Sequence, residues 1–320
     1  MSVPIDQVDN LKDQETIVVR KLAWWAALAA LGCAAIWAGQ SVAVKVALEG
    51  IPPITIMALR FLMALPIVYL VSRVLRVGLK PVGNEWKALM LSGFLLCTQI
   101  CLFTLGTRAT TSVHSTILIN SFPFFAAFAG HFILKGHRLT ARIVLGIAIA
   151  FSGIPLLVLE GNEHPASGSL LGNIMVVGAA FFVGTKIVVM KRILEHMHPV
   201  KLAFWDGAAA VAIFGVIALF KESGEPMILS SAVVGGMVYQ GLVVSAMGFL
   251  IWLFLLSKFS ANQLNVFRLF TPPLGVILGS VILKEPVSHF ALTSLLLVCA
   301  GLYFVLKGSP PEPSPTEPSA

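Results

Sequence analysis

The chain has 320 residues, of which 57% are hydrophobic and only 12% are charged, and its formal net charge is +7. About a quarter of the residues in a typical soluble domain are charged, so this chain has too few charges to cover a water-facing surface. A mean hydropathy of +0.90 agrees with a membrane protein. In that setting the positive charge indicates cytoplasmic loops. We expect the lipid bilayer as a partner and no nucleic acid.

Ten apolar runs of roughly the length that an α-helix needs to cross a bilayer follow one another along the chain. They occupy residues 22–44, 54–72, 88–107, 111–134, 142–159, 170–190, 200–220, 232–257, 261–282 and 288–307. The polar residues 1–21 show no cleavable signal peptide and predict a cytoplasmic N-terminal segment. Residues 308–320 are rich in proline and predict a disordered cytoplasmic tail. The longest connection predicted outside, residues 160–169, contains no lysine or arginine.

Positive residues are distributed unevenly between the two sets of connections. If the N-terminus is cytoplasmic, fifteen lysines and arginines fall in cytoplasmic segments and four fall outside. The four outside residues are Lys45, Arg108, Lys221 and Lys284. Membrane proteins show this bias toward positive cytoplasmic loops. It predicts a multi-pass protein of the cell (inner) membrane with an even number of spans and both termini in the cytoplasm.

A long apolar segment interrupted by proline occurs once in each half of the chain. In the second half it contains Pro272 and Pro273 and ends near Glu285. In the first half Pro123 lies 149 residues before Pro272, and His137 lies 148 residues before Glu285. This spacing predicts that the chain is built from two related halves.

Two halves of five spans each must face opposite ways across the membrane, because five is an odd number. The predicted fold is therefore an all-α integral membrane fold of ten transmembrane helices in two inverted five-helix repeats, residues 22–159 and 170–307. Residues 34–40 and 179–185 give a second match between the halves, at an offset of 145. Inverted repeats place a binding site between them near the middle of the bilayer.

Several short motifs occur in the same order within the spans and recur in both halves. They are Trp37-Ala-Gly-Gln40, Lys45, Pro53, Arg60, Asn120, Pro123, Gly136-His-Arg-Leu-Thr140, Gly146, Gly153, Pro272, Glu285 and Gly301. Together they resemble the drug/metabolite transporter superfamily, in its bacterial ten-helix form called EamA, over roughly residues 22–307. One position departs from the family, because His137 stands where glutamate is common.

The resemblance implies a secondary transporter that moves a small organic metabolite or drug by alternating access through a central cavity. It further suggests export of an amino acid or a related carboxylate. A nucleotide-sugar or phosphate-ester carrier of the same superfamily is an alternative, and a non-transporting membrane sensor or an intramembrane enzyme is an alternative from another class. Uniport, exchange and coupling to protons are left open.

Charged residues inside the spans are the first candidates for a site, because each costs about 2.5–3.5 kcal/mol unless it is paired or hydrated. They are Arg60, Lys186, Asp206 and Arg268. Three cations and one carboxylate predict a net positive interior that favours an anionic substrate group. Arg268 is the strongest candidate, because Pro272 four residues later frees a backbone carbonyl in a helix that would line a cavity. The alternative is that Arg268 extends to the cytoplasmic interface.

Arg60 and Asp206 occupy corresponding positions in the two halves, 146 residues apart. We favour a structural role for both, in which each pairs locally or orients loops near a helix end; a gating or substrate contact is the alternative. Asp206 is the only carboxylate predicted inside the membrane. Lys186 either faces the cavity or extends to the interface.

Neutral polar and aromatic side chains on the spans that line the family's cavity complete the predicted site, although each could equally serve helix packing. The predicted substrate-binding residues are Arg268, Asn120, Trp37, Gln40, Gln99, Tyr239, Trp252 and Lys186. The predicted gating or structural residues are Arg60, Asp206, Pro123, Pro272, Pro273, Glu285 and His137. Gln240 and Ser245 are further polar residues of the predicted span 232–257, which is one of the spans that line the family's cavity.

No cofactor, metal site or enzymatic activity is expected. The four cysteines lie in apolar runs without accompanying histidine or carboxylate, and residues 195–198 hold two histidines but no third ligand. A Gly-rich nucleotide-binding loop does not occur, so ATP is not the expected energy source. The small-molecule substrate is the expected partner, and formation of a homodimer is left open.

Overall fold

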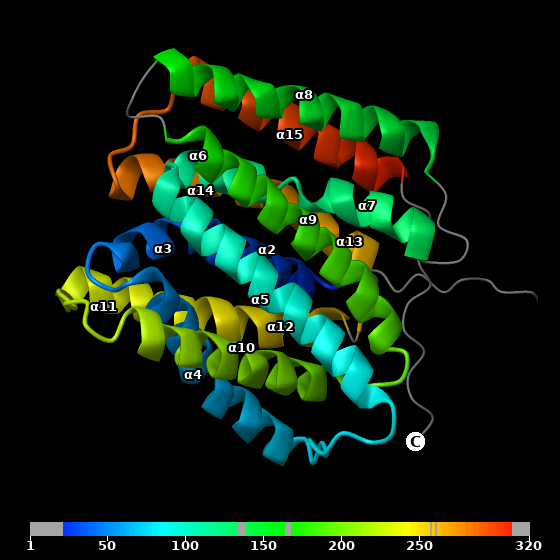
Figure 1. The fold of residues 1–320 in the computed structure, drawn as a ribbon. Helices are drawn as coiled ribbons and strands as arrows, with labels where there is room; N and C mark the ends of the chain where they lie inside the picture. Colours follow the sequence, from blue (N-terminus) through cyan, green and yellow to red (C-terminus); the bar gives the residue numbers. More distant parts are fainter. Residues whose placement is uncertain (1–21, 134–138, 164–167, 257, 260, 309–320) are drawn as a thin grey trace, which may run out of the picture.

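A computed structural model describes residues 22–133, 139–163, 168–256, 258–259 and 261–308, and the regular structure of these residues is helical throughout (Figure 1). Nine of the described helical segments are long and apolar enough to cross a membrane. A further helix, Ala141–Glu163, carries a shorter apolar stretch, Ala141–Leu157. The predicted ten-helix integral membrane fold is confirmed, including the short fifth span.

Each repeat contains continuous helices and helices that are interrupted near their middle. The first repeat consists of α2 (Trp24–Ala38), α3 (Gln40–Leu48), α4 (Pro53–Val74), α5 (Glu85–Ala109), α6 (Ser112–Ile119), α7 (Phe122–Ile133) and α8 (Ala141–Glu163). The second consists of α9 (Leu170–Ile193), α10 (Pro199–Lys221), α11 (Ser231–Val238), the π-helix η2 (Tyr239–Gly248), α12 (Phe249–Leu256), α13 (Ala261–Asn265), the 3₁₀-helix η3 (Val266–Phe270), α14 (Thr271–Ile282) and α15 (His289–Gly308).

The interruptions have local causes in the sequence. Pro123 follows the break between α6 and α7, and Pro272 lies in the first turn of α14. Proline lacks the N–H that continues a helix, so the chain is free to tighten into η3 before Pro272. Gly39 separates α2 from α3, and the ring of Tyr239 packs where a side chain at Gly39 would lie. These three interrupted spans, together with the span formed by α11, η2 and α12, have their breaks near the middle of the bundle.

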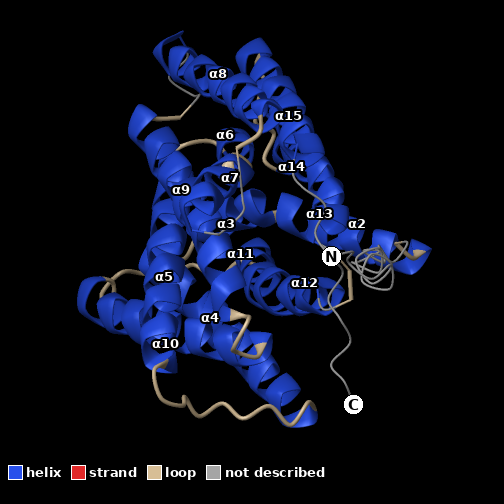
Figure 2. Cartoon of the chain, turned by 90° about the vertical axis from the view of Figure 1, so that its right-hand side faces the viewer, coloured by secondary structure: helices blue, strands red, loops and turns tan. Residues whose placement is uncertain are grey.

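Helices from the two repeats pair in opposite directions, as inverted repeats require. Gly146 of α8 lies against Gly301 of α15, and Gly153 lies against Ser294, so the two helices run antiparallel in close contact. Without side chains at these glycines the backbones can approach closely. Figures 1 and 2 both show α8 and α15 side by side at one edge of the bundle.

The outer surface of the bundle is apolar over much of its area. Large side chains such as Phe94, Val216 and Leu296 are exposed. A soluble protein would bury such a surface, whereas lipid tails cover it in a membrane. The multi-pass membrane class follows from this surface together with the helix lengths.

One predicted connection proves to be helical. Residues 160–163 belong to α8, and Glu160 is buried, with Oε2 at 3.1 Å from Nε2 of His114. The prediction of a loop beginning at residue 160 was wrong, because the helix continues beyond its apolar stretch where a polar partner is available. Asp206 is therefore not the only buried carboxylate on a membrane-crossing helix. The predicted terminal segments, residues 1–21 and 309–320, lie outside the described residues.

Candidate functional site

A cavity of about 470 Å³ lies between the two repeats in the centre of the bundle. Both halves of the chain line it, through α2–α7 in the first repeat and through α9, α10, η2, α12–α14, η3 and α15 in the second. Most of its wall is apolar, with a few polar groups, as is usual for small-molecule sites. The cavity therefore occupies the position that the inverted repeats predicted.

Among the described residues, those that line the cavity reach toward one end of the bundle. The lining residues on α4, α9 and α15 reach as far as Val68, Lys191 and Leu306. These helices end at the side of the molecule that carries Lys191, Arg192 and Lys307, which we call the basic end. Substrate therefore has its shortest path to the cavity from the basic end.

Two carboxylates of the second repeat hold helix starts of the first repeat at the opposite end, which we call the capped end. Glu285 accepts hydrogen bonds from the N–H groups of Ser112 (2.9 Å) and Val113 (3.0 Å) at the start of α6. Glu222 accepts from the N–H groups of Ile54 (3.0 Å) and Thr55 (2.7 Å) at the start of α4. Both carboxylates satisfy free N–H donors and interact favourably with the helix dipole, so they tie the repeats together.

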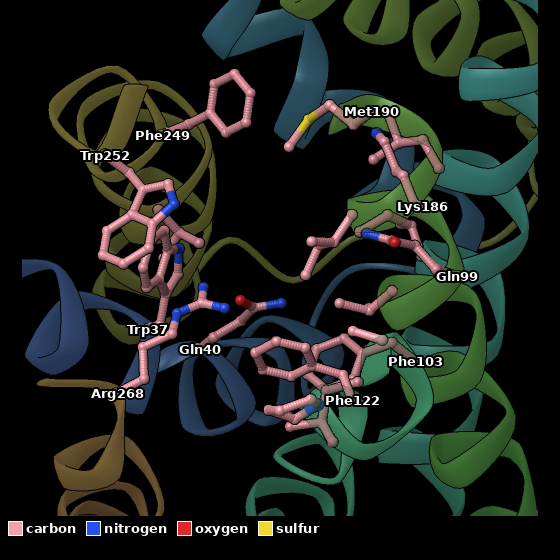
Figure 3. A pocket seen from close by; sticks show the side chains of 18 of the residues that line it. Trp37, Gln40, Gln99, Phe103, Phe122, Lys186, Met190, Phe249, Trp252 and Arg268 are labelled. Atoms are coloured by element: carbon pink, nitrogen blue, oxygen red, sulfur yellow. The ribbon is translucent and has the colours of Figure 1, made fainter. Parts of the chain in front are cut away.

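Arg268 lies on the cavity wall between aromatic rings. Its guanidinium carbon is 4.4 Å from the ring centroid of Trp37, 4.7 Å from that of Phe122 and 4.9 Å from that of Trp252. Such contacts contribute about 2 kcal/mol each when they are desolvated. Figure 3 shows the guanidinium beside the Gln40 amide, with Trp37 and Trp252 above it. The side chain stays inside the bundle and does not extend to the basic end.

No carboxylate among the described residues pairs with Arg268. No other described residue accepts a hydrogen bond from its guanidinium. The three rings hold the side chain in place without using its five N–H donors. These donors remain free for an anion in the cavity. A carboxylate or a phosphate group matches their geometry, because each accepts two parallel hydrogen bonds from a guanidinium.

Lys186 and Asp206 face the cavity as an ion pair. The ammonium of Lys186 donates to Oδ2 of Asp206 at 2.7 Å, and both side chains are largely buried. Figure 3 places Lys186 and Gln99 on the wall opposite Arg268. The pair is neutral as a unit, so the predicted net positive interior comes from the remaining cations. Of the two alternatives given for Lys186, the structure shows the one in which it faces the cavity, where it is held by Asp206.

Several buried polar atoms on the wall have no hydrogen-bond partner among the described residues. They are Nη1 of Arg60, Oε1 of Gln99, Oγ1 of Thr116, Oδ1 of Asp206 and Oγ1 of Thr271. A buried polar group without a partner costs about 1–3 kcal/mol. Such a concentration around one cavity indicates that water or a ligand supplies the missing partners.

The structure brings most of the predicted substrate-binding residues to this cavity. Those that line it are Trp37, Gln40, Gln99, Asn120, Lys186, Trp252 and Arg268. Tyr239 does not line it; its hydroxyl donates to the backbone oxygen of Ile36 at 2.7 Å, which braces the break at Gly39. Gln240 likewise donates to the backbone oxygen of Gln40 at 2.7 Å.

Some of the predicted gating and structural residues line the cavity, and others lie away from it. Arg60, Asp206 and Pro123 line the cavity, whereas Pro272, Pro273 and Glu285 do not. His137 lies outside the described residues. The local pairing expected of Asp206 is present in its contact with Lys186.

Some residues at the site were not predicted from the sequence. Phe122 supplies the third ring around Arg268, and Thr116 and Thr271 add unpartnered hydroxyls. Phe122 precedes Pro123, so the helix break was the signal that could have identified it. Glu222 had no signal of its own, because it follows α10 but caps α4, whose Thr55 lies 167 residues earlier in the chain.

Metal ligation has no structural support among the described residues, where no three histidine, cysteine, aspartate or glutamate side chains come together. The cysteines Cys33, Cys97, Cys101 and Cys299 are free thiols. The chemistry that the cavity offers is therefore that of guanidinium, amide, hydroxyl and aromatic groups.

Comparison with known proteins identifies relatives of the whole helical region. Residues 24–159 and again residues 170–307 match the EamA-like transporter family. A protein of Escherichia coli (strain K12) named "Probable amino-acid metabolite efflux pump" is 25% identical over 282 residues, which cover 85% of this chain and 92% of that protein. An uncharacterized transporter of Archaeoglobus fulgidus is 25% identical over 271 residues, covering 84% of this chain and 92% of that protein.

A crystal structure of a protein that is 16% identical has the same fold. It superposes with a TM-score of 0.64 and covers 87% of this chain and 94% of the other. At this identity the likeness concerns the fold alone. It extends over both repeats, because the covered share exceeds the length of either one.

Proposed function

The chain belongs to the EamA-like transporter family, and we propose that it exports a small carboxylate, an amino acid or a related metabolite, across the cell (inner) membrane. The observation that carries this proposal is Arg268, a cation on the cavity wall whose hydrogen-bond donors have no partner among the residues that the structure describes. The name of the Escherichia coli relative agrees with an amino-acid metabolite as substrate.

The surroundings of Arg268 suit a carboxylate that carries an organic body. Trp37, Phe122 and Trp252 form an apolar surface next to the charge. A substrate carboxylate would bind the guanidinium while its carbon skeleton packs on the rings. Gln40 and Asn120 line the same cavity and would bind further polar groups of the substrate.

The two ends of the bundle agree with the proposed export. The basic end would face the cytoplasm by the positive-inside rule, with both termini on that side. Since the lining residues reach toward that end, a substrate would enter the cavity of this state from the cytoplasm. Opening of the capped end would then release the substrate outside, which is alternating access between two inverted repeats.

Flux through the purified transporter in liposomes tests this function. The substrates would be labelled amino acids, organic acids, amines and nucleotide sugars. Removal of the guanidinium in Arg268→Ala should reduce carboxylate flux roughly 10- to 150-fold, since a hydrogen bond to a charged group contributes about 1.5–3 kcal/mol. Arg268→Lys keeps the charge without the planar fork and should give an intermediate rate.

The matched control is Arg73→Ala, which removes an exposed arginine near the basic end of α4. Its flux should equal that of the unmodified protein. Elution as a single species in detergent would show that each variant is folded. Carboxylate flux that survives in Arg268→Ala would overturn the assigned site, and selective flux of amines or nucleotide sugars would overturn the substrate class.

A further inference from the structure

We propose that the transported anion carries two acidic groups, and that Arg60 binds the second while Arg268 binds the first. This inference rests on the proposed function, since it names the substrate class of the same cavity. It follows from the charges on the wall, from the environment of Arg60 and from the different positions at which the two arginines contact one span.

Two cations deep on the cavity wall have no carboxylate partner among the described residues. The charged residues that line the cavity are Arg60, Lys186, Lys191, Asp206 and Arg268. Asp206 is the only carboxylate in this set of described residues, and Lys186 occupies it at 2.7 Å. Lys191 lies in the last turn of α9, at the basic end. Arg60 and Arg268 therefore face the deeper part of the cavity as two uncompensated positive charges.

Arg60 is buried at the wall with unused hydrogen-bonding capacity. Only 6% of the residue is exposed. Its Nε donates to Oγ of Ser245 at 2.6 Å, which fixes the orientation of the guanidinium. Its Nη1 has no partner among the described residues, and none of their carboxylates pairs with it. A buried guanidinium without a counter-ion is costly, and an anionic group of the substrate would remove that cost.

The two arginines contact different parts of one span. Arg60 contacts Ser245 in η2, and Arg268 contacts Trp252 in α12, seven residues further along. Seven residues make between one and two turns of helix, so the two side chains meet this span at different levels of the cavity. Each guanidinium can bind its own acidic group, and a short dicarboxylate supplies two such groups in one molecule.

The pair glutamate and glutamine provides the test, because the two molecules have the same shape and differ by one acidic group. Uptake of each labelled amino acid would be measured in liposomes that contain the full-length transporter. We expect glutamate to be transported at least tenfold more efficiently than glutamine. In Arg60→Gln the ratio of the two rates should fall at least tenfold, and Arg60→Lys should restore part of it.

Arg73→Gln is the matched control, since Arg73 is an exposed arginine on the same helix as Arg60. It should leave the ratio unchanged. Equal transport of both amino acids by the unmodified protein, or a parallel loss of both rates in Arg60→Gln, would overturn this proposal. Glutamine flux that still depends on Arg268 would then leave the proposed function standing. Inhibition by inorganic phosphate but not by succinate would overturn the dicarboxylate assignment.

Discussion

Glu285 is expected to hold the capped end of the bundle closed, and its removal should open that end. Its carboxylate accepts from the Ser112 and Val113 N–H groups at 2.9 and 3.0 Å, and from the Ser112 hydroxyl at 2.8 Å. The acceptor follows α14 of the second repeat, and the donors begin α6 of the first. Separation of the two helices at this end would break all three hydrogen bonds. The contact therefore stabilises the closed state selectively.

The size of the effect can be worked out from these contacts. Loss of a side chain that caps a helix N-terminus costs about 0.5–2 kcal/mol. Loss of the favourable interaction with the helix dipole adds about 0.3–1 kcal/mol. A combined loss of about 2 kcal/mol in Glu285→Ala would shift the equilibrium between closed and open states roughly 30-fold, at tenfold per 1.4 kcal/mol. The shift depends only on how much more strongly the Glu285 contacts stabilise the closed state than the open state.

Accessibility of the cavity from outside the cell measures this shift. Gln40→Cys places a thiol on the cavity wall, in a background in which the four native cysteines are replaced. A membrane-impermeant maleimide added outside should label this thiol much faster in Glu285→Ala than with Glu285 intact. Glu49→Ala is the control, because Glu49 is an exposed carboxylate that follows α3. Unchanged labelling in Glu285→Ala, with the protein folded, would refute the assigned role of the cap.

Two further predictions concern stability, measured by thermal unfolding in detergent. Lys186→Met leaves Asp206 buried without its partner and should destabilise the protein by about 3 kcal/mol. The double variant that adds Asp206→Leu should recover most of that loss. Equal losses in the single and double variants would contradict the pairing. Gly301→Val should cost about 1–3 kcal/mol, because a Cβ at this position would lie 2.5 Å from the Gly146 oxygen. Gly215→Val, where nothing lies within 4 Å of the added Cβ, should have little effect, and similar losses in both glycine variants would contradict the close packing of α8 and α15.

The number, order and inversion of the spans could be predicted from the sequence because they depend on properties that accumulate over many residues. Apolar runs of sufficient length can be recognised even when their predicted ends are wrong by a few residues. The same holds for prolines at matching positions, such as Pro123 and Pro272. Glu160 shows the limit of that reasoning. A carboxylate after an apolar run resembles the start of a loop, yet the helix continues where His114 supplies a buried partner.

The polar residues near the middle of the membrane could be identified from the sequence, but their partners could not. Lys186 and Asp206 lie on successive spans, and nothing in their spacing showed that their charges would cancel. Tyr239 was placed in a cavity-lining span, but its position on the helix turns its hydroxyl toward Ile36. The side of a helix that faces the cavity depends on how the spans rotate against one another, and η2 changes that rotation within one span.

The two repeats share a backbone arrangement, and their differences at equivalent positions create the polarity of the cavity. Arg60 and Asp206 are equivalent by an offset of 146 residues, and both line the wall. Ile119 and Arg268 are equivalent by the offset of 149 that relates the two prolines, and both line the wall as well. Lys186 neutralises Asp206, so the charges on Arg60 and Arg268 remain without a counter-ion. The two repeats thus supply similar backbones, and the uncompensated charges of the cavity come from residues that differ between the repeats.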